Sequence, residues 1–146
     1  MLKFDYEKVN GAHIRGVYGT EPRILNDASF SCELVSIQTD NETIVISVNI
    51  DTDELVMELD SDDLKFEHNP YDCDFREKLV DIDPVLKLKG KSLGWTWSLT
   101  NQQGYSDGLL FGFGDEFSQP LNPAIALVGQ ASEIAIHTIS PLRPPS

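Results

Sequence analysis

The feature that most constrains the fold is a period of two in the side chains between residues 90 and 114. Large apolar side chains alternate with small or polar ones over residues 92–99, and the alternation returns over residues 109–113. Because successive side chains of a β-strand point to opposite faces, each run predicts a strand with one apolar face. The polar, glycine-containing loop between them predicts an antiparallel hairpin. Trp95 and Trp97 lie in the first run, and we expect them to anchor the core.

Further alternating runs predict more strands of the same kind. They cover residues 12–18, 30–39, 43–50, 55–60, 85–91 and 132–139. In the run over residues 30–39 the apolar phase changes, which predicts a β-bulge near residues 34–36. Because strands and helices do not alternate, a parallel α/β fold is disfavoured. We predict a mainly β protein of seven to eight strands, built as an antiparallel curved sheet, a partial barrel or a small sandwich.

One or two short helices are expected between these strands. Asp72 is a suitable N-cap for one of them, and Pro84 would end that element. A second helix is predicted over residues 124–128, because Pro123 and Gly129 match its first position and the position after its end.

The domain organisation follows from the length and from the ends of the chain. With 146 residues and no internal repeat, we predict one antiparallel β domain over residues 1–140. Residues 141–146 are predicted to form a Pro-rich tail. The first residues carry acids and lack the apolar stretch of a signal peptide, and no apolar run approaches the roughly 20 residues that span a bilayer. We therefore expect a cytoplasmic protein with no membrane partner.

Negative charge is concentrated in one third of the chain. The net charge is −13, and residues 40–83 hold fifteen acids and three bases, against nine acids and eight bases elsewhere. Such a field repels nucleic acid and attracts cationic partners, although a solvated face that keeps a protein soluble shows the same pattern. We predict a non-enzymatic interaction module that binds a basic protein. The candidate partner-binding residues are Asp51, Asp53, Glu54, Asp60, Asp62 and Asp63.

The loop after the tryptophan strand suggests an alternative function. Its amide, phenol and carboxylate groups lie beside aromatic rings, a combination that can bind a sugar or another metabolite by stacking and hydrogen bonding. The candidate ligand-binding residues are Trp97, Asn101, Tyr105 and Asp107. The same residue types close hairpin loops, with Gly104 at positive φ and Asn101 and Asp107 in Asx turns, so loop structure is the favoured explanation of the pattern.

No catalytic residue, metal site or cofactor is predicted. The chain contains no nucleophile elbow, zinc-site spacing or glycine-rich phosphate loop, and its Asp-rich turns do not match the EF-hand pattern. Cys32 lies on an apolar strand face, where a cysteine behaves as a small hydrophobe, and Cys73 lies among acids that disfavour its thiolate. An unidentified hydrolase ranks third among the candidate functions. Hydrolases such as glycosidases use a pair of carboxylates, but acids are so plentiful in this chain that no single pair is informative.

The segment from Gly90 to Asp107, GKSLGWTWSLTNQQGYSD, resembles a known pattern of a glycine, a tryptophan strand and Asn-x-x-Gly-Tyr-x-Asp. This pattern is similar to that of small acidic bacterial proteins catalogued as a domain of unknown function. The resemblance covers the last third of the chain, implies a bacterial cytoplasmic protein and carries over no catalytic residue. In size and acidity the chain is also similar to immunity proteins that neutralise toxins.

Overall fold

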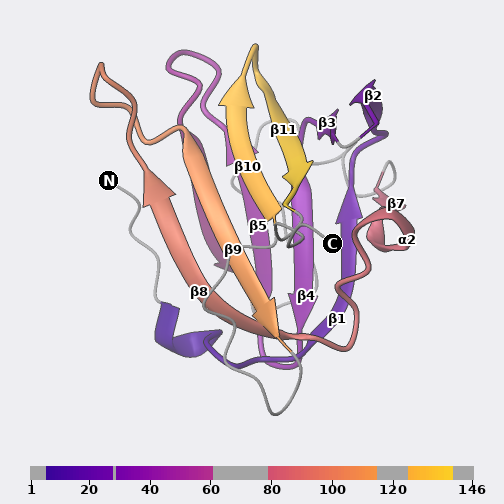
Figure 1. Cartoon of the computed structure of the whole chain (residues 1–146). Coiled ribbons are helices and arrows are strands. Elements are labelled where there is room, and N and C mark those ends of the chain that lie inside the picture. Colours follow the sequence, from indigo (N-terminus) through magenta and orange to yellow (C-terminus); the bar gives the residue numbers. More distant parts are fainter. Residues whose placement is uncertain (1–5, 28, 61–78, 115–124, 140–146) are drawn as a thin grey trace, which may run out of the picture.

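The computed structural model describes residues 6–27, 29–60, 79–114 and 125–139, which fold into two antiparallel β-sheets packed on each other (Figure 1). One sheet has the strand order β6-β5-β4-β1-β7, and the other has the order β2-β3-β11-β10-β9-β8. The strands are β1 Ile14–Gly19, β2 Arg23–Asn26, β3 Ser29–Cys32, β4 Val35–Thr39, β5 Thr43–Val48, β6 Leu55–Asp60, β7 Val80–Asp81, β8 Ser92–Leu99, β9 Gly108–Gly114, β10 Ile125–Gln130 and β11 Glu133–Thr138. The mainly β prediction is confirmed, and of its three architectures the structure is the sandwich.

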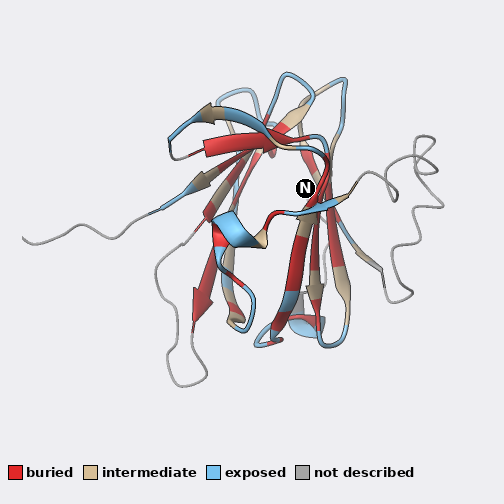
Figure 2. Ribbon diagram, turned by 90° about the vertical axis from the view of Figure 1, so that its right-hand side faces the viewer, coloured by how far each residue is buried: buried red, intermediate tan, exposed pale blue. Residues whose placement is uncertain are grey.

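The hydrophobic core lies between the two sheets. Figure 2 shows the buried residues along the strands of both sheets and most of the exposed ones in the turns. The largest fully buried side chains are Phe111, Ile14, Leu34, Ile37, Ile44, Ile46, Leu55, Leu88, Leu109, Leu127, Ile134 and Ile136. The predicted inward positions of β5, β6 and β11 are therefore confirmed where the strands continue. Ile50 is 64% exposed because β5 ends two residues before it.

The two sheets are joined at one corner by backbone pairing before β1. The amide of Gly11 donates to the carbonyl oxygen of Leu93 at 2.8 Å, and the amide of Leu93 donates to Ala12 at 2.9 Å. His13 and Ser92 form an isolated β-bridge at the same place. The start of β8 is thus paired on both sides, and within the part of the chain that the structure describes the two sheets form no closed barrel.

The predicted single strand over residues 30–39 is wrong, because the chain passes there from one sheet to the other. β3 belongs to the six-stranded sheet and β4 to the five-stranded sheet. The hydroxyl of Thr20 accepts hydrogen bonds from the amides of Glu33 at 2.6 Å and Leu34 at 3.3 Å. The change in apolar phase therefore marks a crossing between sheets that Thr20 stabilises, and not a β-bulge.

The predicted helix over residues 124–128 is also wrong. This segment forms β10, which pairs with β9 on one side and with β11 on the other. Ile125 and Leu127 are buried, whereas Ala126 and Val128 are half-buried. The hydrogen bonds and burial available between two strands outweigh the weak helix-end signals of Pro123 and Gly129.

The predicted strand over residues 85–91 is replaced by a short helix, α2 Asp83–Leu86. Pro84 lies in its first turn, where a missing amide hydrogen costs nothing, and Lys87 follows with a φ of 57°. One carboxylate oxygen of Asp83 accepts the amides of Leu88 at 2.8 Å and Lys89 at 3.0 Å, which stabilises the exit from the helix. Lys87, Lys89 and Lys91, which a strand over residues 85–91 would place on one face, therefore do not share a strand face. The helix expected after Asp72 begins outside the described residues.

Two further observations concern the helices of the described residues. A 3-10 turn, η1 Tyr6–Lys8, precedes the corner that joins the sheets. Among the described residues, no helix has the length and apolar character needed to cross a membrane.

The predicted hairpin is confirmed as β8 and β9, but the predicted burial of its tryptophans is wrong. The pairing runs from Ser92 opposite Gly114 to Leu99 opposite Gly108, with a register shift between Leu93 and Thr96. Directly opposed residues of an antiparallel pair point to the same face. Leu93 faces the core opposite Phe113, and beyond the shift Thr96 faces the core opposite Phe111. 

The extra residue in β8 therefore reverses the phase of the strand. Trp95 and Trp97 point away from the core, where Trp95 is 59% exposed and Trp97 is half-buried. The aromatic residues that anchor the core are instead Phe111 and Phe113 of β9, whose rings stack with centroids 6.1 Å apart. A bulge of this kind cannot be read from the side-chain alternation, because it depends on how the strand pairs.

Candidate functional site

Three turns that are far apart in the sequence meet at one end of the sandwich. They are the β5–β6 turn (residues 49–54), the β8–β9 loop (residues 100–107) and the β10–β11 turn (residues 131–132), which lie together at the top of Figure 1. We call this region the three-loop end. It contains residues from both predicted sites, the acidic partner-binding set and the polar ligand-binding set.

The β5–β6 turn is bonded to the β8–β9 loop through Ser106. The amide of Leu55 donates to the carbonyl oxygen of Ser106 at 3.0 Å, and the amide of Ser106 donates to a carboxylate oxygen of Glu54 at 3.1 Å. The other carboxylate oxygen of Glu54 accepts the hydroxyl of Thr52 at 3.2 Å. One oxygen of Glu54 thus links the two loops, and the other stabilises its own turn.

The end of β10 and the β10–β11 turn after it are bonded to the other two loops in the same way. The amide of Gly129 donates to the carbonyl oxygen of Asp107 at 2.8 Å. The amide of Ser132 donates to a carboxylate oxygen of Asp53 at 3.0 Å. Asp53 itself has a φ of 59°, a conformation that Asp tolerates better than most residues. The side chains of Asp53 and Glu54 therefore hold the turns of the three-loop end together.

The β8–β9 loop is closed by its own polar side chains. The amide nitrogen of the Asn101 side chain donates to Asp107 at 3.1 Å, and the Asn101 side-chain oxygen accepts the backbone amides of Gln103 at 2.9 Å and Tyr105 at 3.2 Å. Gly104 has a φ of +88°. The Asx turn predicted at Asn101 and the positive φ predicted at Gly104 are therefore confirmed, whereas Asp107 accepts the side chain of Asn101 across the loop instead of forming an Asx turn of its own.

The exposed groups of the three-loop end include one acid among several polar residues, and three apolar side chains are exposed in or beside its loops. Asp51 is exposed, and within the described residues its carboxylate has no hydrogen-bond or ion-pair partner. Ile50 is 64% exposed, Leu99 42% and Tyr105 38%. An exposed carboxylate among exposed apolar side chains is suited to contact a protein surface that carries a cation in an apolar setting.

The six acids predicted as one partner-binding set are not all brought together. Asp51, Asp53 and Glu54 lie at the three-loop end, whereas Asp60 ends β6 opposite Thr43, at the other end of that strand. Asp62 and Asp63 lie outside the described residues. Similarly, Trp97 stands on the outward face of β8, beside the loop that contains the other predicted ligand-binding residues.

Gly129, Ser106 and Ser132 also belong to the three-loop end, although the sequence did not indicate them. A Cβ atom on Gly129 would overlap the carbonyl oxygen of Asp53, so the close approach of the two turns requires glycine. The sequence does contain a signal for this close approach. Gly129 continues the inward positions of Ile125 and Leu127, and a glycine inside a strand often marks a place where another backbone comes near.

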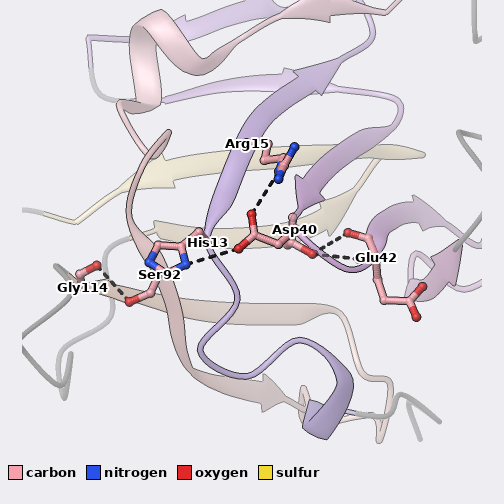
Figure 3. A network of polar contacts seen from close by, with 7 residues as sticks. His13, Arg15, Asp40, Glu42, Ser92 and Gly114 are labelled. Atoms are coloured by element: carbon pink, nitrogen blue, oxygen red, sulfur yellow. Dashed lines mark hydrogen bonds and ion pairs between the residues drawn. The ribbon is translucent and has the colours of Figure 1, made fainter.

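A second polar network lies at the opposite end of the sandwich (Figure 3). The carboxylate of Asp40 accepts the Nε–H of Arg15 at 3.0 Å and lies 3.3 Å from Nδ1 of His13. The hydrogen bond from Arg15 is the main reason that the pKa of Asp40 is lowered. These side chains are solvent-exposed, so the network joins β1 to the β4–β5 turn at modest energetic gain.

Two further findings concern metal ligation and the thiol of the described residues. No group of three or more His, Cys, Asp or Glu side chains there is arranged to hold a metal ion. Cys32 is a free, buried thiol, and its pKa is raised to about 12, first by burial and then by the negative charge of Glu133. It is therefore a poor nucleophile at neutral pH.

The fold and this site define a class of protein: an open antiparallel β-sandwich with an acidic, partly apolar three-loop end. A family of unknown function, DUF6334, matches residues 1–143, and the chain belongs to this family. Comparison with curated proteins and with solved structures finds no match. The resemblance to a domain of unknown function is thus confirmed, and it extends over nearly the whole chain.

Proposed function

We propose that this protein is a non-enzymatic interaction module that binds a basic protein through its three-loop end. The observation that carries the proposal is the exposed Asp51 carboxylate, which stands on the same end as the exposed side chains of Ile50, Leu99 and Tyr105. Interfaces combine such apolar side chains with charges that steer the partner and fix its orientation. In this proposal the protein acts in the bacterial cytoplasm, and its partner is neither a nucleic acid nor a membrane.

The hydrogen bonds of the loops support a division of roles. Asp53 and Glu54 hold the turns in place, while the free carboxylate of Asp51 is available to a cation. The loops are therefore preorganised, which lowers the entropy cost of binding. The excess of acid in residues 40–83 would raise the rate of encounter with a basic protein.

Affinity capture from a native host lysate tests the proposal. The immobilised protein should retain a basic protein at about 0.01 M salt and release it at about 1 M, because the Debye length falls from roughly 30 Å to 3 Å. Asp51→Asn and Tyr105→Ala should each reduce the amount retained. Glu42→Gln is the matched control, because Glu42 lies in the β4–β5 turn at the opposite end. Equal retention by wild type and Asp51→Asn, or no basic protein at low salt, would reject the proposal.

Small-ligand binding ranks second. The Asn101 side chain uses its oxygen and its nitrogen within the loop, and Asp107 is bonded to it, so a sugar would have to displace these bonds. Tyr105 and Trp97 still offer rings to an apolar or stacked ligand. Quenching of tryptophan fluorescence by sugars or metabolites, lost in Trp97→Phe, would favour this function over the first.

A further inference from the structure

One edge of the six-stranded sheet lacks the features that normally protect a strand edge. An edge strand exposes backbone N–H and C=O groups that pair readily with another chain, and proteins protect such edges with short strands, charges, proline or bulges. Here β7 has two residues, β2 has four residues and a register shift, and β6 carries Glu58 and Asp60. β8 is the outermost strand of its sheet (Figure 1) and has eight residues, SLGWTWSL, without charge or proline.

The bulge of β8 does not protect the second half of the strand. The register shift lies between Leu93 and Thr96, and the start of the strand before it is paired on its outer side by residues 11–14. Beyond the shift, residues 96–99 run on as a regular strand beside β9. We call the side of residues 96–99 that faces away from β9 the β8 edge.

The backbone hydrogen bonds of β10 show which way the residues of β9 point. Successive residues of an antiparallel strand bond alternately to the strands on its two sides. The amide of Gly129 bonds toward β9, to the carbonyl oxygen of Asp107. Every second residue of β10 therefore bonds toward β9, and the two that precede Gly129 in this series lie opposite Leu109 and Phe111. Leu110, between those two residues, consequently bonds to β8.

The same alternation shows which backbone groups the β8 edge presents. Leu110 lies opposite Trp97, so Trp97 bonds to β9, and its neighbours Thr96 and Ser98 direct their N–H and C=O groups to the β8 edge. Among the described residues, no backbone group pairs with Thr96 or Ser98 on that side. These groups are therefore available to an added strand.

The β8 edge is accessible from both faces of the sheet. Ser98 points to the core side, opposite Leu109, and is nevertheless exposed. On the other face Trp95 is 59% exposed and Trp97 is half-buried. Since exposed side chains stand on both faces, this part of β8 is open to a further strand.

We propose that the β8 edge binds an extended segment of the basic partner as an additional β-strand. The inference rests on the proposed function, because β8 ends at Leu99, where the β8–β9 loop of the three-loop end begins, and a segment on this edge continues to that site. In this mode of binding the backbone hydrogen bonds supply affinity, and contacts to alternate side chains supply specificity.

The pairing also determines the residue pattern of the bound segment. The residues of the segment that bond to Thr96 and Ser98 lie directly opposite them, on the core side of the sheet. The residues between them lie on the face of Trp95 and Trp97, where aromatic rings favour apolar or β-branched neighbours. Because the chain has a net charge of −13, basic residues suit the first set of positions and apolar residues the second.

Binding of a synthetic peptide to the full chain tests the proposal. The probe is a peptide of about ten residues in which lysine and valine alternate. Two variants carry N-methyl groups on the backbone amides of either the lysines or the valines, so they have equal charge and differ in which edge can pair. Methylated lysine amides should weaken binding at least roughly tenfold relative to methylated valine amides, because the lysine edge bonds to β8. Equal affinities of the two variants, or no binding of the unmethylated peptide, would overturn the proposal.

A pair of protein variants assigns the binding to β8. Ser98→Pro removes the amide hydrogen that points to the β8 edge, whereas Ser98→Ala keeps it and serves as the matched control. Peptide affinity should fall roughly tenfold in Ser98→Pro and stay unchanged in Ser98→Ala. In the capture from host lysate, retention that Asp51→Asn reduces but Ser98→Pro leaves unchanged would overturn the added strand alone. Retention that neither variant changes would reject the proposed function as well.

Hydrogen exchange of the wild type keeps the test independent of whether Ser98→Pro folds. In the free protein the amides of Thr96 and Ser98 should exchange faster than those of Trp97 and Leu99, which bond to β9. The unmethylated peptide should slow the exchange of Thr96 and Ser98. Amides of these two residues that are already protected in the free protein, or that the bound peptide leaves unprotected, would contradict the proposal.

Discussion

Gly129 shows how a single residue can determine the geometry of the three-loop end. Its amide donates to Asp107, and its Cα faces the carbonyl oxygen of Asp53. In Gly129→Ala the new methyl group would overlap a backbone atom that cannot rotate away, so we expect a loss of about 3 kcal/mol in the free energy of unfolding. Gly90→Ala, where a Cβ meets nothing within 4 Å but φ is +88°, should lose roughly 1–2 kcal/mol. Urea denaturation checks the contrast, which equal losses would contradict.

Cys32 is buried against the core, and its burial predicts its reactivity. Because the pKa of its thiol is raised to about 12, almost no thiolate forms at pH 8, and the side chain is also shielded from reagents. In a Cys73→Ser background, we expect alkylation of Cys32 by iodoacetamide to be slow in the native protein and fast in urea. Mass spectrometry of timed samples measures this. Rapid modification of the native protein would show that β3 opens readily.

Glu133 contributes stability that depends on pH. The hydrogen bond from Arg23 is the largest cause of its lowered pKa, followed by that from the hydroxyl of Ser31. A carboxyl whose pKa is lower in the folded state stabilises the protein above its ordinary pKa, and this stabilisation is lost as the pH falls through the folded-state pKa. The wild type should therefore unfold at higher urea than Glu133→Gln at pH 7, with the difference shrinking below about pH 4.5. In an Arg23→Gln background the difference should be small at every pH.

At the scale of elements, the bulge in β8 decides which aromatic residues stabilise the protein. Phe111 is 1% exposed, so Phe111→Ala should cost about 3–5 kcal/mol, as large-to-small core substitutions do. Trp97 points away from the core and is half-buried, so Trp97→Ala should cost less than about 2 kcal/mol. Chemical denaturation of both variants measures this. A larger loss for Trp97→Ala would mean that β8 pairs without the bulge.

At the scale of the whole molecule, the net charge of −13 sets the response to salt. Much of this charge belongs to residues 40–83, which include β5 and β6 of one sheet, and like charges held together in a folded chain repel one another. Moderate sodium chloride should therefore raise the melting temperature at pH 7 by screening this repulsion. Scanning calorimetry measures the change. A melting temperature that falls with salt would show that pairs such as Arg23–Glu133 outweigh the repulsion.

The sequence alone determined the elements whose signal is local. Alternating side chains predicted β5, β6, β9 and β11 correctly, because the inward residues of a strand repeat every second position whatever the strand pairs with. The preferences of turn residues likewise predicted that Asn101 and Gly104 close the β8–β9 loop. This signal is local, because the two hydrogen bonds that the Asn101 side chain accepts span at most four residues. The count of acids and bases along the chain also located the excess of negative charge in residues 40–83, and the alternating runs indicated a mainly β protein.

Only the tertiary structure decided the features that depend on pairing between distant segments. The bulge that turns Trp95 and Trp97 outward, the crossing at Glu33, and β10 in place of a helix all follow from hydrogen bonds to strands elsewhere in the chain. The three-loop end is of the same kind, since Glu54 bonds Ser106 and Asp53 bonds Ser132 across 52 and 79 residues. The physical reason is that local propensities differ by about 1 kcal/mol or less, whereas each pairing brings several hydrogen bonds and buried side chains together.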